Sequence, residues 1–214
     1  MGVNSILADK PRLDDKLLAT SSSMDSVEGY AAGQASRVAW VADALAEKFN
    51  LAPRDRQFLE QAALLHDIGE VTMNREYLRS ARTLTATERL DLERHPVIGE
   101  QDIAKLDLPK SVQLIVRWHH EWWNGTGYPD GLEGEQIPLA ARILRVADTY
   151  CSLTADRPWR QAMTDEAARR ELTEWAGIEF DPAIVLAFRD VRMMQEAAPR
   201  ASEPVSNEIF STYR

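Results

Sequence analysis

The chain has 214 residues, of which 44% are apolar and 28% charged, and its formal net charge is −9. These values are ordinary for one soluble globular domain, and the negative charge argues against sequence-independent binding to duplex DNA or to an anionic membrane surface. The single cysteine, Cys151, excludes an internal disulfide and a thiolate-rich metal cluster, so we expect a reducing compartment.

The sequence contains no apolar stretch of about 18 residues, which a membrane-spanning helix would need. Its N-terminus also lacks the basic-then-apolar order of a secretory signal. We therefore expect a cytoplasmic protein that is not bound to a membrane.

Taken in chain order, residues 1–25 are polar and include the run TSSSMDS, so we expect a flexible N-terminal arm. Residues 26–196 carry apolar residues at helical spacing and show no alternating strand pattern, which predicts an all-α, single-domain helical bundle. Residues 197–214 form a polar C-terminal tail. The expected helices cover 31–50, 53–70, 84–95, 96–106, 110–120, 137–153, 165–176 and 181–194.

Several of these helices have recognisable end signals. Thr85 and Glu88 have the spacing of a capping box, and Thr164 has the position of an N-cap. Asp181 followed by a proline opens the last helix. Gly69 is expected to end the helix that begins at residue 53.

The chain has four histidines, and all lie between residues 66 and 120 at or near expected helix ends. A single histidine on an apolar stripe is more often a satisfied core residue than a metal ligand. A cluster that includes His66, His95, His119 and His120, with Asp67 directly after His66, favours imidazoles and a carboxylate that converge in space.

Asp148 lies on the apolar face of its helix, in line with Ala141, Leu144 and Cys151. A buried carboxylate costs several kcal/mol unless it is paired or coordinates a cation. Two interpretations are open: a buried ion pair with an arginine, or a ligand of the same metal site as the histidines.

Histidine and aspartate without cysteine favour a catalytic site for Fe, Mn, Zn or Mg over a structural zinc site. Side chains of adjacent helical residues diverge by about 100°. The pairs His66–Asp67 and His119–His120 therefore suit two neighbouring ions about 4 Å apart.

Four segments together resemble the HD-GYP domain, a branch of the HD superfamily of metal-dependent phosphohydrolases. They are LLHDIGE, RHPVIGEQDI, RWHHEWWNGTGYPDGLEGEQIPLAARILRVADTY and LTADRPWR, and the likeness runs from about residue 32 to about residue 188. A His-Asp dipeptide alone is weak evidence. The order and spacing of all four segments make the resemblance specific.

The resemblance implies a phosphodiesterase that hydrolyses cyclic di-GMP or a related cyclic dinucleotide with two divalent metal ions, such as Fe or Mn. It implies a catalytic, bridging role for Asp67 and substrate contacts from Tyr128, Arg157 and Arg160. A diguanylate cyclase or another signalling protein is a further expected partner. The implied metal ligands are His66, Asp67, His95, His119, His120 and Asp148.

The sequence departs from the family pattern at five positions. Gln34 stands where a histidine is usual, and Tyr30 stands where some members have a glutamate. Glu70 and Ser80 replace two usual lysines, and Cys151 replaces a further aspartate. Glu70 reverses a charge beside the expected phosphate site, although its carboxylate also offers a substitute ligand.

Three hypotheses therefore stand side by side. The first is a working cyclic-dinucleotide phosphodiesterase. The second is a catalytically degenerate signalling module that binds a nucleotide or a protein partner without hydrolysis, and it is motivated by Gln34 and Glu70. The third is a nucleotidase that acts on mononucleotides.

Overall fold

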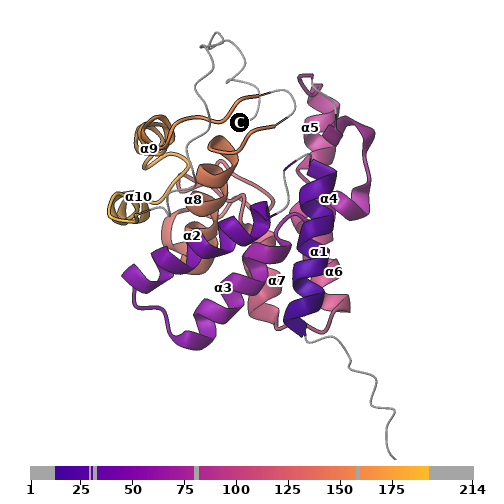
Figure 1. The fold of residues 1–214 in the computed structure, drawn as a ribbon, viewed down its shortest axis with the longest axis horizontal. Coiled ribbons are helices and arrows are strands. Elements are labelled where there is room, and N and C mark those ends of the chain that lie inside the picture. The colour runs from indigo at the N-terminus through magenta and orange to yellow at the C-terminus, as the bar shows by residue number, and fades with distance from the viewer. Residues whose placement is uncertain (1–12, 29, 31–32, 80–81, 158–159, 193–214) are drawn as a thin grey trace, which may run out of the picture.

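The structure is a computed structural model that describes residues 13–28, 30, 33–79, 82–157 and 160–192 (Figure 1). Within these ranges the chain forms helices and loops, with isolated bridge pairs but no extended strand, which confirms the all-α prediction. None of the described helices is long and apolar enough to cross a membrane. The α-helices are α1 (Leu13–Glu28), α2 (Gln34–Lys48), α3 (Pro53–Leu65), α4 (Ile68–Met73), α5 (Ala86–Leu92), α6 (His95–Lys105), α7 (Lys110–Trp118), α8 (Leu139–Leu153), α9 (Asp165–Glu174) and α10 (Pro182–Phe188). Two short 3-10 helices are η1 (Glu76–Arg79) and η2 (Gly134–Gln136).

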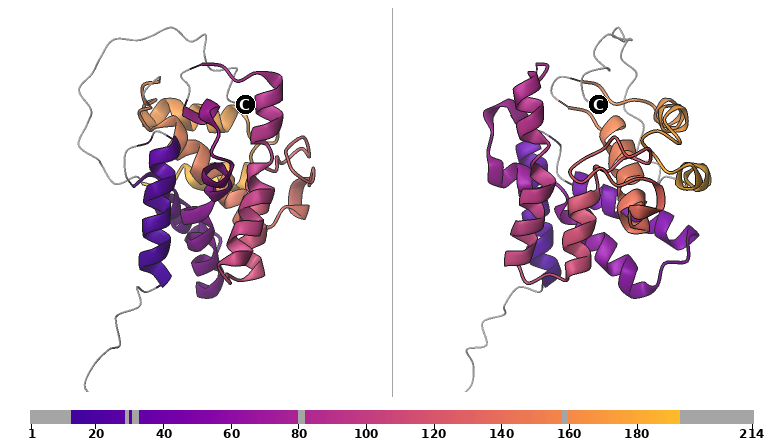
Figure 2. Two further views of the ribbon diagram at one scale, coloured as in Figure 1. Left: turned by 90° about the vertical axis from the view of Figure 1, so that its right-hand side faces the viewer. Right: turned by 180° about the vertical axis from the view of Figure 1, so that it is seen from behind.

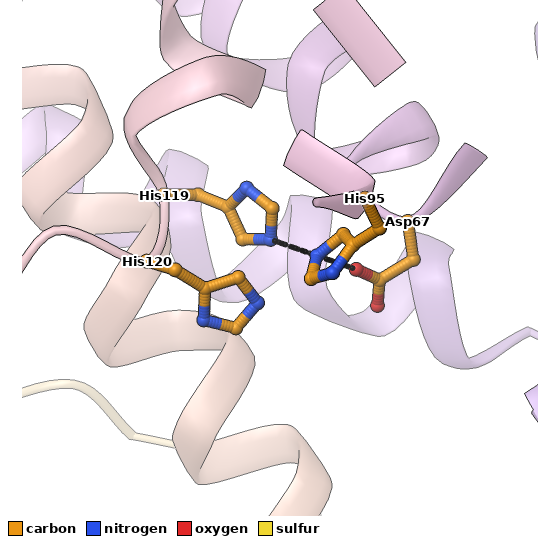
Figure 3. Close-up of side chains that lie close together, drawn as sticks. All are labelled: Asp67, His95, His119 and His120. Carbon is orange, nitrogen blue, oxygen red and sulfur yellow. Dashed lines mark hydrogen bonds and ion pairs between the residues drawn. The ribbon is translucent and has the colours of Figure 1, made fainter. Parts of the chain in front are cut away.

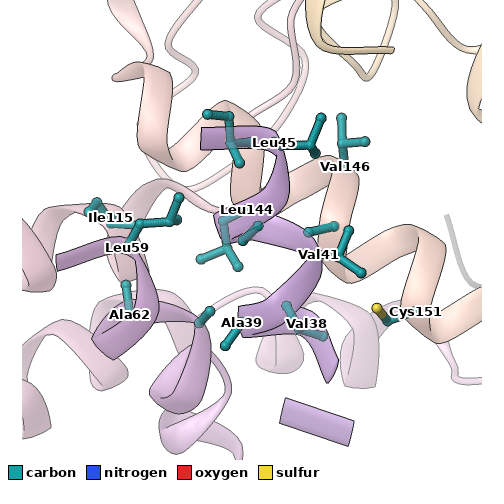
Figure 4. Close-up of a cluster of buried hydrophobic side chains, with 14 of the residues drawn as sticks. Val38, Ala39, Val41, Leu45, Leu59, Ala62, Ile115, Leu144, Val146 and Cys151 are labelled. Carbon is teal, nitrogen blue, oxygen red and sulfur yellow. The ribbon is translucent and has the colours of Figure 1, made fainter. Parts of the chain in front are cut away.

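The core forms where α2 packs against both α3 and α8. Leu45 of α2, Leu59 of α3 and Leu144 of α8 have no exposed surface and lie in one cluster (Figure 4). The apolar residues of α2 recur every three or four positions, so they form one stripe that both neighbours cover. Cys151 also belongs to this core and is fully buried. The core fixes α3 and α8, which carry His66 at one end and Asp148 along one face.

The prediction of a flexible arm over residues 1–25 is wrong for residues 13–25, which belong to helix α1. Figures 1 and 2 show α1, in indigo, along the edge of the bundle, and it packs against α2, α3 and α4. Leu17 and Met24 are two helical turns apart and are both buried in the core. Residues 1–12 and the expected tail at 197–214 lie outside the described residues.

Asp25 joins α1 to the start of α2. Its buried carboxylate accepts hydrogen bonds from the backbone N–H groups of Gly33, Gln34 and Ala35 at 2.8, 3.0 and 3.0 Å. Gly33 is the N-cap residue of α2 and has no side chain that could cap the helix. Asp25, which belongs to the preceding helix α1, accepts hydrogen bonds from the free N–H groups of α2 in its place.

We expect Asp25→Ala to lower the free energy of unfolding by about 2–3 kcal/mol, because it leaves these backbone donors without a charged acceptor. Asp25→Asn retains one acceptor oxygen and should lose less. Urea unfolding of the three proteins at neutral pH measures both differences. An alanine variant as stable as the wild type would contradict this role of Asp25.

Residues 53–70 do not form the single helix that the sequence predicts. Helix α3 ends at Leu65, His66 and Asp67 form a turn, and Gly69 lies inside α4 instead of ending a helix. A Cβ atom at Gly69 would lie 2.1 Å from the carbonyl oxygen of His95, so the glycine permits α4 to touch α6. The turn and this contact together bring Asp67 to His95.

The predicted helix ends have mixed outcomes. The Thr85–Glu88 capping box is present, and the side chains of Thr164 and Asp181 cap α9 and α10. Helix α10 ends at Phe188, earlier than predicted, and the expected end at residue 194 lies outside the described residues.

Candidate metal centre

The four histidines and Asp67 lie at helix ends that meet at one point of the bundle. His66 follows α3, Asp67 precedes α4, His95 begins α6, and His119 and His120 follow α7. One ligand atom from each of Asp67, His95, His119 and His120 lies within 4.8 Å of the others (Figure 3). The sequence correctly predicted that these groups converge.

Backbone carbonyls fix the orientation of three of the rings. In each ring Nδ1 lies within hydrogen-bond distance of the carbonyl oxygen three residues earlier. Because a carbonyl only accepts, Nδ1 carries a proton, and Nε2 has a lone pair whenever the ring is neutral. The pairs are His66 with Ala63 at 2.8 Å, His95 with Leu92 at 2.8 Å, and His119 with Val116 at 2.6 Å.

The three Nε2 atoms surround the carboxylate of Asp67. His66 Nε2 lies 3.0 Å from Oδ2, while Nε2 of His95 and His119 lie 3.2 and 3.5 Å from Oδ1. Oδ1 is buried and has no hydrogen-bond partner among the described residues, and the Nε2 atoms of His95 and His119 are only 3.4 Å apart. Lone pairs that face one another repel unless a cation lies between them. This donor set therefore fits a divalent metal ion.

The charges in this cluster support the same conclusion. Burial opposes a charge on His66, yet the carboxylates of Asp67 and Asp148 outweigh it and raise the pKa of His66 well above its usual value. Burial also opposes ionisation of Asp67, but the His66 charge and the neighbouring imidazoles hold its pKa well below the usual range. In the absence of a metal ion, a proton on His66 is thus the available counter-charge, and metal binding would displace it.

Asp148, on α8, lies next to a histidine of the cluster and also next to an arginine, so both interpretations from the sequence have a partner in the structure. Its Oδ1 is 3.5 Å from His66 Nε2, and its Oδ2 is 3.7 Å from Nη1 of Arg145. The ion-pair interpretation and the metal-ligand interpretation therefore involve different oxygens of the same carboxylate. A role for Asp148 as a ligand stays a prediction.

His120 differs from the other three histidines. Its Nδ1 lies 2.9 Å from Nη1 of Arg145, and its ring stacks on Tyr128 with centroids 4.9 Å apart and an interplanar angle of 19°. A guanidinium can only donate, so Nδ1 of His120 accepts this hydrogen bond. The sequence analysis did not identify Arg145. Its position one turn before Asp148 on the same helix is the one signal that could have identified it.

A buried glutamate shapes the loop that carries Tyr128. Glu121 is 2% exposed and accepts hydrogen bonds from the backbone N–H groups of Asp130 at 2.7 Å and Leu132 at 3.0 Å. A Cβ atom at Gly127 would lie 2.2 Å from the backbone nitrogen of Trp122, so the loop folds tightly onto itself. The backbone N–H of Tyr128 donates to the carbonyl of His120, which places the tyrosine at the cluster.

The two tryptophans of this loop contact their own domain. The ring of Trp122 packs edge-on against Trp175 at 6.1 Å, and the Arg142 guanidinium lies 5.6 Å from the ring of Trp123. These contacts favour a packing role over a free stacking surface for a base.

Asp130 closes the outer side of the same loop and provides a test at low pH. Arg117 and the indole N–H of Trp118 donate to its carboxylate, and these bonds lower the pKa of Asp130 to about 2. A carboxyl whose pKa is lower in the folded state contributes stability above its unfolded pKa of about 4, and this contribution is lost as the pH falls from about 4 to 2. The side chain is 34% exposed, so solvent screening limits the contribution to less than about 1 kcal/mol.

We therefore expect Asp130→Asn to flatten the pH dependence of stability between about pH 4 and 2, as urea unfolding would show. Carboxyl NMR of the wild type gives the pKa directly. A titration midpoint near pH 4 would contradict the role of Arg117.

The sequence profile of the HD domain matches residues 5–184. The chain belongs to the HD-domain family. It is of the HD-GYP type, and its curated relatives are cyclic-dinucleotide phosphodiesterases at about 35% identity. One is the 3'3'-cGAMP-specific phosphodiesterase 3 of Vibrio cholerae, 34% identical over 83% of this chain and 40% of the relative. Another is the cyclic di-GMP phosphodiesterase response regulator RpfG of Xanthomonas campestris, 35% identical over 86% of this chain and 50% of the relative.

Solved structures agree with this assignment. Bd1817, described as an HDG"Y"P protein from Bdellovibrio bacteriovorus, matches with a TM-score of 0.60 and 25% identity over 73% of this chain and 50% of that one. A cyclic GMP-AMP-specific phosphodiesterase of V. cholerae shares the fold, with a TM-score of 0.65 at 20% identity over 81% of this chain and 47% of that one. The chain thus spans about half the length of the relatives it matches.

The two arginines that the HD-GYP pattern assigns to the substrate lie beyond α8. The guanidinium of Arg157 is 3.9 Å from the ring of Tyr30, and Arg160 donates to the carbonyl of Ser152. Tyr30 thereby contacts the arginine from the position where some members have a glutamate. A role for Arg157 and Arg160 at substrate phosphates stays a prediction.

The remaining departures from the HD-GYP pattern lie in different surroundings. Gln34 is 8% exposed, and its side-chain nitrogen has no hydrogen-bond partner among the described residues. Burial and the negative charges of Asp67 and Asp148 raise the pKa of Glu70 well above its usual value. The carboxyl of Glu70 therefore lies close enough to the cluster to interact electrostatically with it. Ser80 lies outside the described residues.

Proposed function

We propose that this HD-GYP domain is a metal-dependent phosphodiesterase that hydrolyses cyclic di-GMP or a related cyclic dinucleotide. The observation that carries the proposal is the convergence of three imidazole Nε2 atoms on the buried carboxylate of Asp67, at 3.0 to 3.5 Å. Without a metal ion, this arrangement of ring nitrogens around a buried carboxylate oxygen that has no hydrogen-bond donor would be electrostatically unfavourable.

The residues of the centre have distinct roles under this proposal. Asp67 and the imidazoles of His66, His95 and His119 hold the metal, and the carbonyl partners of the rings keep each Nε2 directed inward. A divalent ion such as Fe or Mn supplies activation of water and stabilisation of charge on a phosphate. The loop that Glu121 holds in place keeps Tyr128 beside His120, and we assign the phenol of Tyr128 a contact with the substrate.

The substrate class is proposed from the relatives. RpfG is a cyclic di-GMP phosphodiesterase, and the V. cholerae relative is specific for 3'3'-cGAMP. Both substrates are cyclic dinucleotides with two phosphodiesters. Arg157 and Arg160 are suited to such phosphates, because a planar guanidinium binds phosphate oxygens in pairs.

Hydrolysis assays test this proposal. The purified protein would be loaded with Mn²⁺ or Fe²⁺ under reducing conditions and incubated separately with cyclic di-GMP, 3'3'-cGAMP and mononucleotides. We expect chromatography to show cleavage of at least one cyclic dinucleotide and its loss on addition of a chelator. No turnover with either metal would refute the proposal, and cleavage of mononucleotides alone would favour the nucleotidase.

The second candidate is a degenerate module that binds nucleotide or a signalling protein without hydrolysis. Gln34 and Glu70 favour it, since the first removes an expected imidazole and the second places a further acidic group near the cluster. The Gln34→His variant separates the two candidates. Turnover that appears only in this variant would assign the degenerate function to the natural chain.

A further inference from the structure

We propose that Arg145 occupies the place of the second metal ion, so that the centre holds one divalent ion per chain instead of two. The proposal rests on the metal-dependent function inferred above for the same residues. In place of the two metal ions predicted from the sequence, the site would contain one metal ion and the guanidinium of Arg145.

The position of the guanidinium is the first argument. Nη1 of Arg145 lies 2.9 Å from Nδ1 of His120 and 3.7 Å from Oδ2 of Asp148. These are two of the six ligands that the family resemblance assigns to the pair of ions. A single cationic group thus lies between an imidazole and a carboxylate that would otherwise be available to a second ion.

The hydrogen bond that Nδ1 of His120 accepts is the second argument. Since Nδ1 accepts from Arg145, a neutral His120 carries its proton on Nε2. His66, His95 and His119 have the opposite arrangement, with Nδ1 on a backbone carbonyl and Nε2 directed at Asp67. His120 therefore has neither ring nitrogen ready for a metal while Arg145 is in place, although its ring lies in the cluster.

A second carboxylate holds Arg145 where it is. Nη2 donates to Oε1 of Glu179 at 2.5 Å, and the side chain of Glu179 is 2% exposed. The arginine side chain is itself only 13% exposed. Withdrawal of the guanidinium would leave the carboxylate of Glu179 buried without a counter-charge, which is strongly unfavourable. Arg145 is consequently a fixed part of the centre.

The charge balance gives the third argument. A guanidinium keeps its charge at any physiological pH, and in a buried site a nearby divalent ion would be repelled by it. The remaining donors, Asp67 with His66, His95 and His119, have no contact with Arg145 among the described ion pairs and suit one ion. Arg145 thus both fills the second position and disfavours any competing ion there.

Metal counting tests this proposal without reference to turnover. Protein stripped with a chelator would be titrated with Mn²⁺, and bound Mn²⁺ per chain would be measured by calorimetry, by elemental analysis after gel filtration, and by electron paramagnetic resonance. We expect one ion in the wild type, with the spectrum of an isolated ion.

The Arg145→Met variant should bind two ions with the spectrum of a coupled pair. Because Arg145→Met leaves Glu179 unpaired, the double variant Arg145→Met/Glu179→Gln removes both charges and protects the test against misfolding. The matched control is Arg142→Met/Asp181→Asn, which removes the buried ion pair between Arg142, one turn earlier on α8, and Asp181, the N-cap of α10. It should still bind one ion.

Two ions in the wild type, no ion in the wild type, or one ion in a folded double variant would each overturn the proposal. Hydrolysis is measured separately. A wild type with one ion, no turnover and a second ion gained in the double variant would support the role of Arg145 while it refutes the proposed phosphodiesterase.

Discussion

Asp67→Ala is expected to lower kcat/KM for a cyclic dinucleotide at least about 10³-fold and to remove tight metal binding. Three imidazole nitrogens face the carboxylate of Asp67 at 3.0 to 3.5 Å, and alanine leaves them without their shared anionic partner. The imidazoles alone carry no charge to balance a divalent ion in a buried site. Elemental analysis after gel filtration and the hydrolysis assay measure the two losses independently.

Asp67→Asn separates the metal site from the fold. The amide has the volume of the carboxylate, and its NH₂ group donates to an unprotonated Nε2, so the buried cluster keeps a satisfied arrangement. We expect a folded protein by circular dichroism with metal affinity and turnover both strongly reduced. Asp43→Ala removes a carboxylate of α2 that pairs with Arg56 of α3 and should retain both properties. An Asn variant with more than about a tenth of the wild-type turnover would show that the charge of Asp67 is dispensable.

The sequence predicts a helix correctly where the periodicity of its apolar residues and the signals at its ends agree. Helix α2 has a continuous apolar stripe, and α9 has both its Thr164 cap and its amphipathic pattern. Helix α1 was missed because its serine-rich centre has low helix propensity, and only Leu17 and Met24, seven residues apart, mark the buried face. Tertiary packing, which local propensity does not contain, makes this segment helical.

The candidate site also contains some residues that the sequence identified and others that it missed. His95 and His119 were found because histidines are rare in this chain and fall in one interval. Arg145 and Glu121 were missed because their roles depend on partners that only the fold brings close. Glu179, the partner of Arg145, is 34 residues away along the chain, and the partners of Glu121 are backbone N–H groups of a folded loop. Neither relation leaves a periodic trace in the sequence.

A single methyl group added at Gly69 should disturb both the fold and the metal centre. A Cβ atom there would lie 2.1 Å from the carbonyl oxygen of His95 and 2.9 Å from the backbone nitrogen of Gly99. Both obstacles are backbone atoms of α6, so no side-chain rotation relieves the overlap. Helices α4 and α6 must separate, and His95 must move away from Asp67.

We expect Gly69→Ala to destabilise the protein by about 3 kcal/mol or more and to weaken metal binding at least about tenfold. The matched control is Gly99→Ala on the facing helix, where the new Cβ would meet Cγ1 of Val116 at 3.1 Å. That side chain can shift slightly, and alanine gains up to about 1 kcal/mol of helix propensity, so the net change should stay within about 1 kcal/mol. Urea unfolding and Mn²⁺ titration of both variants make the comparison. Equal stability of the two alanine variants would mean that the close contact at Gly69 does not set the distance between Asp67 and His95.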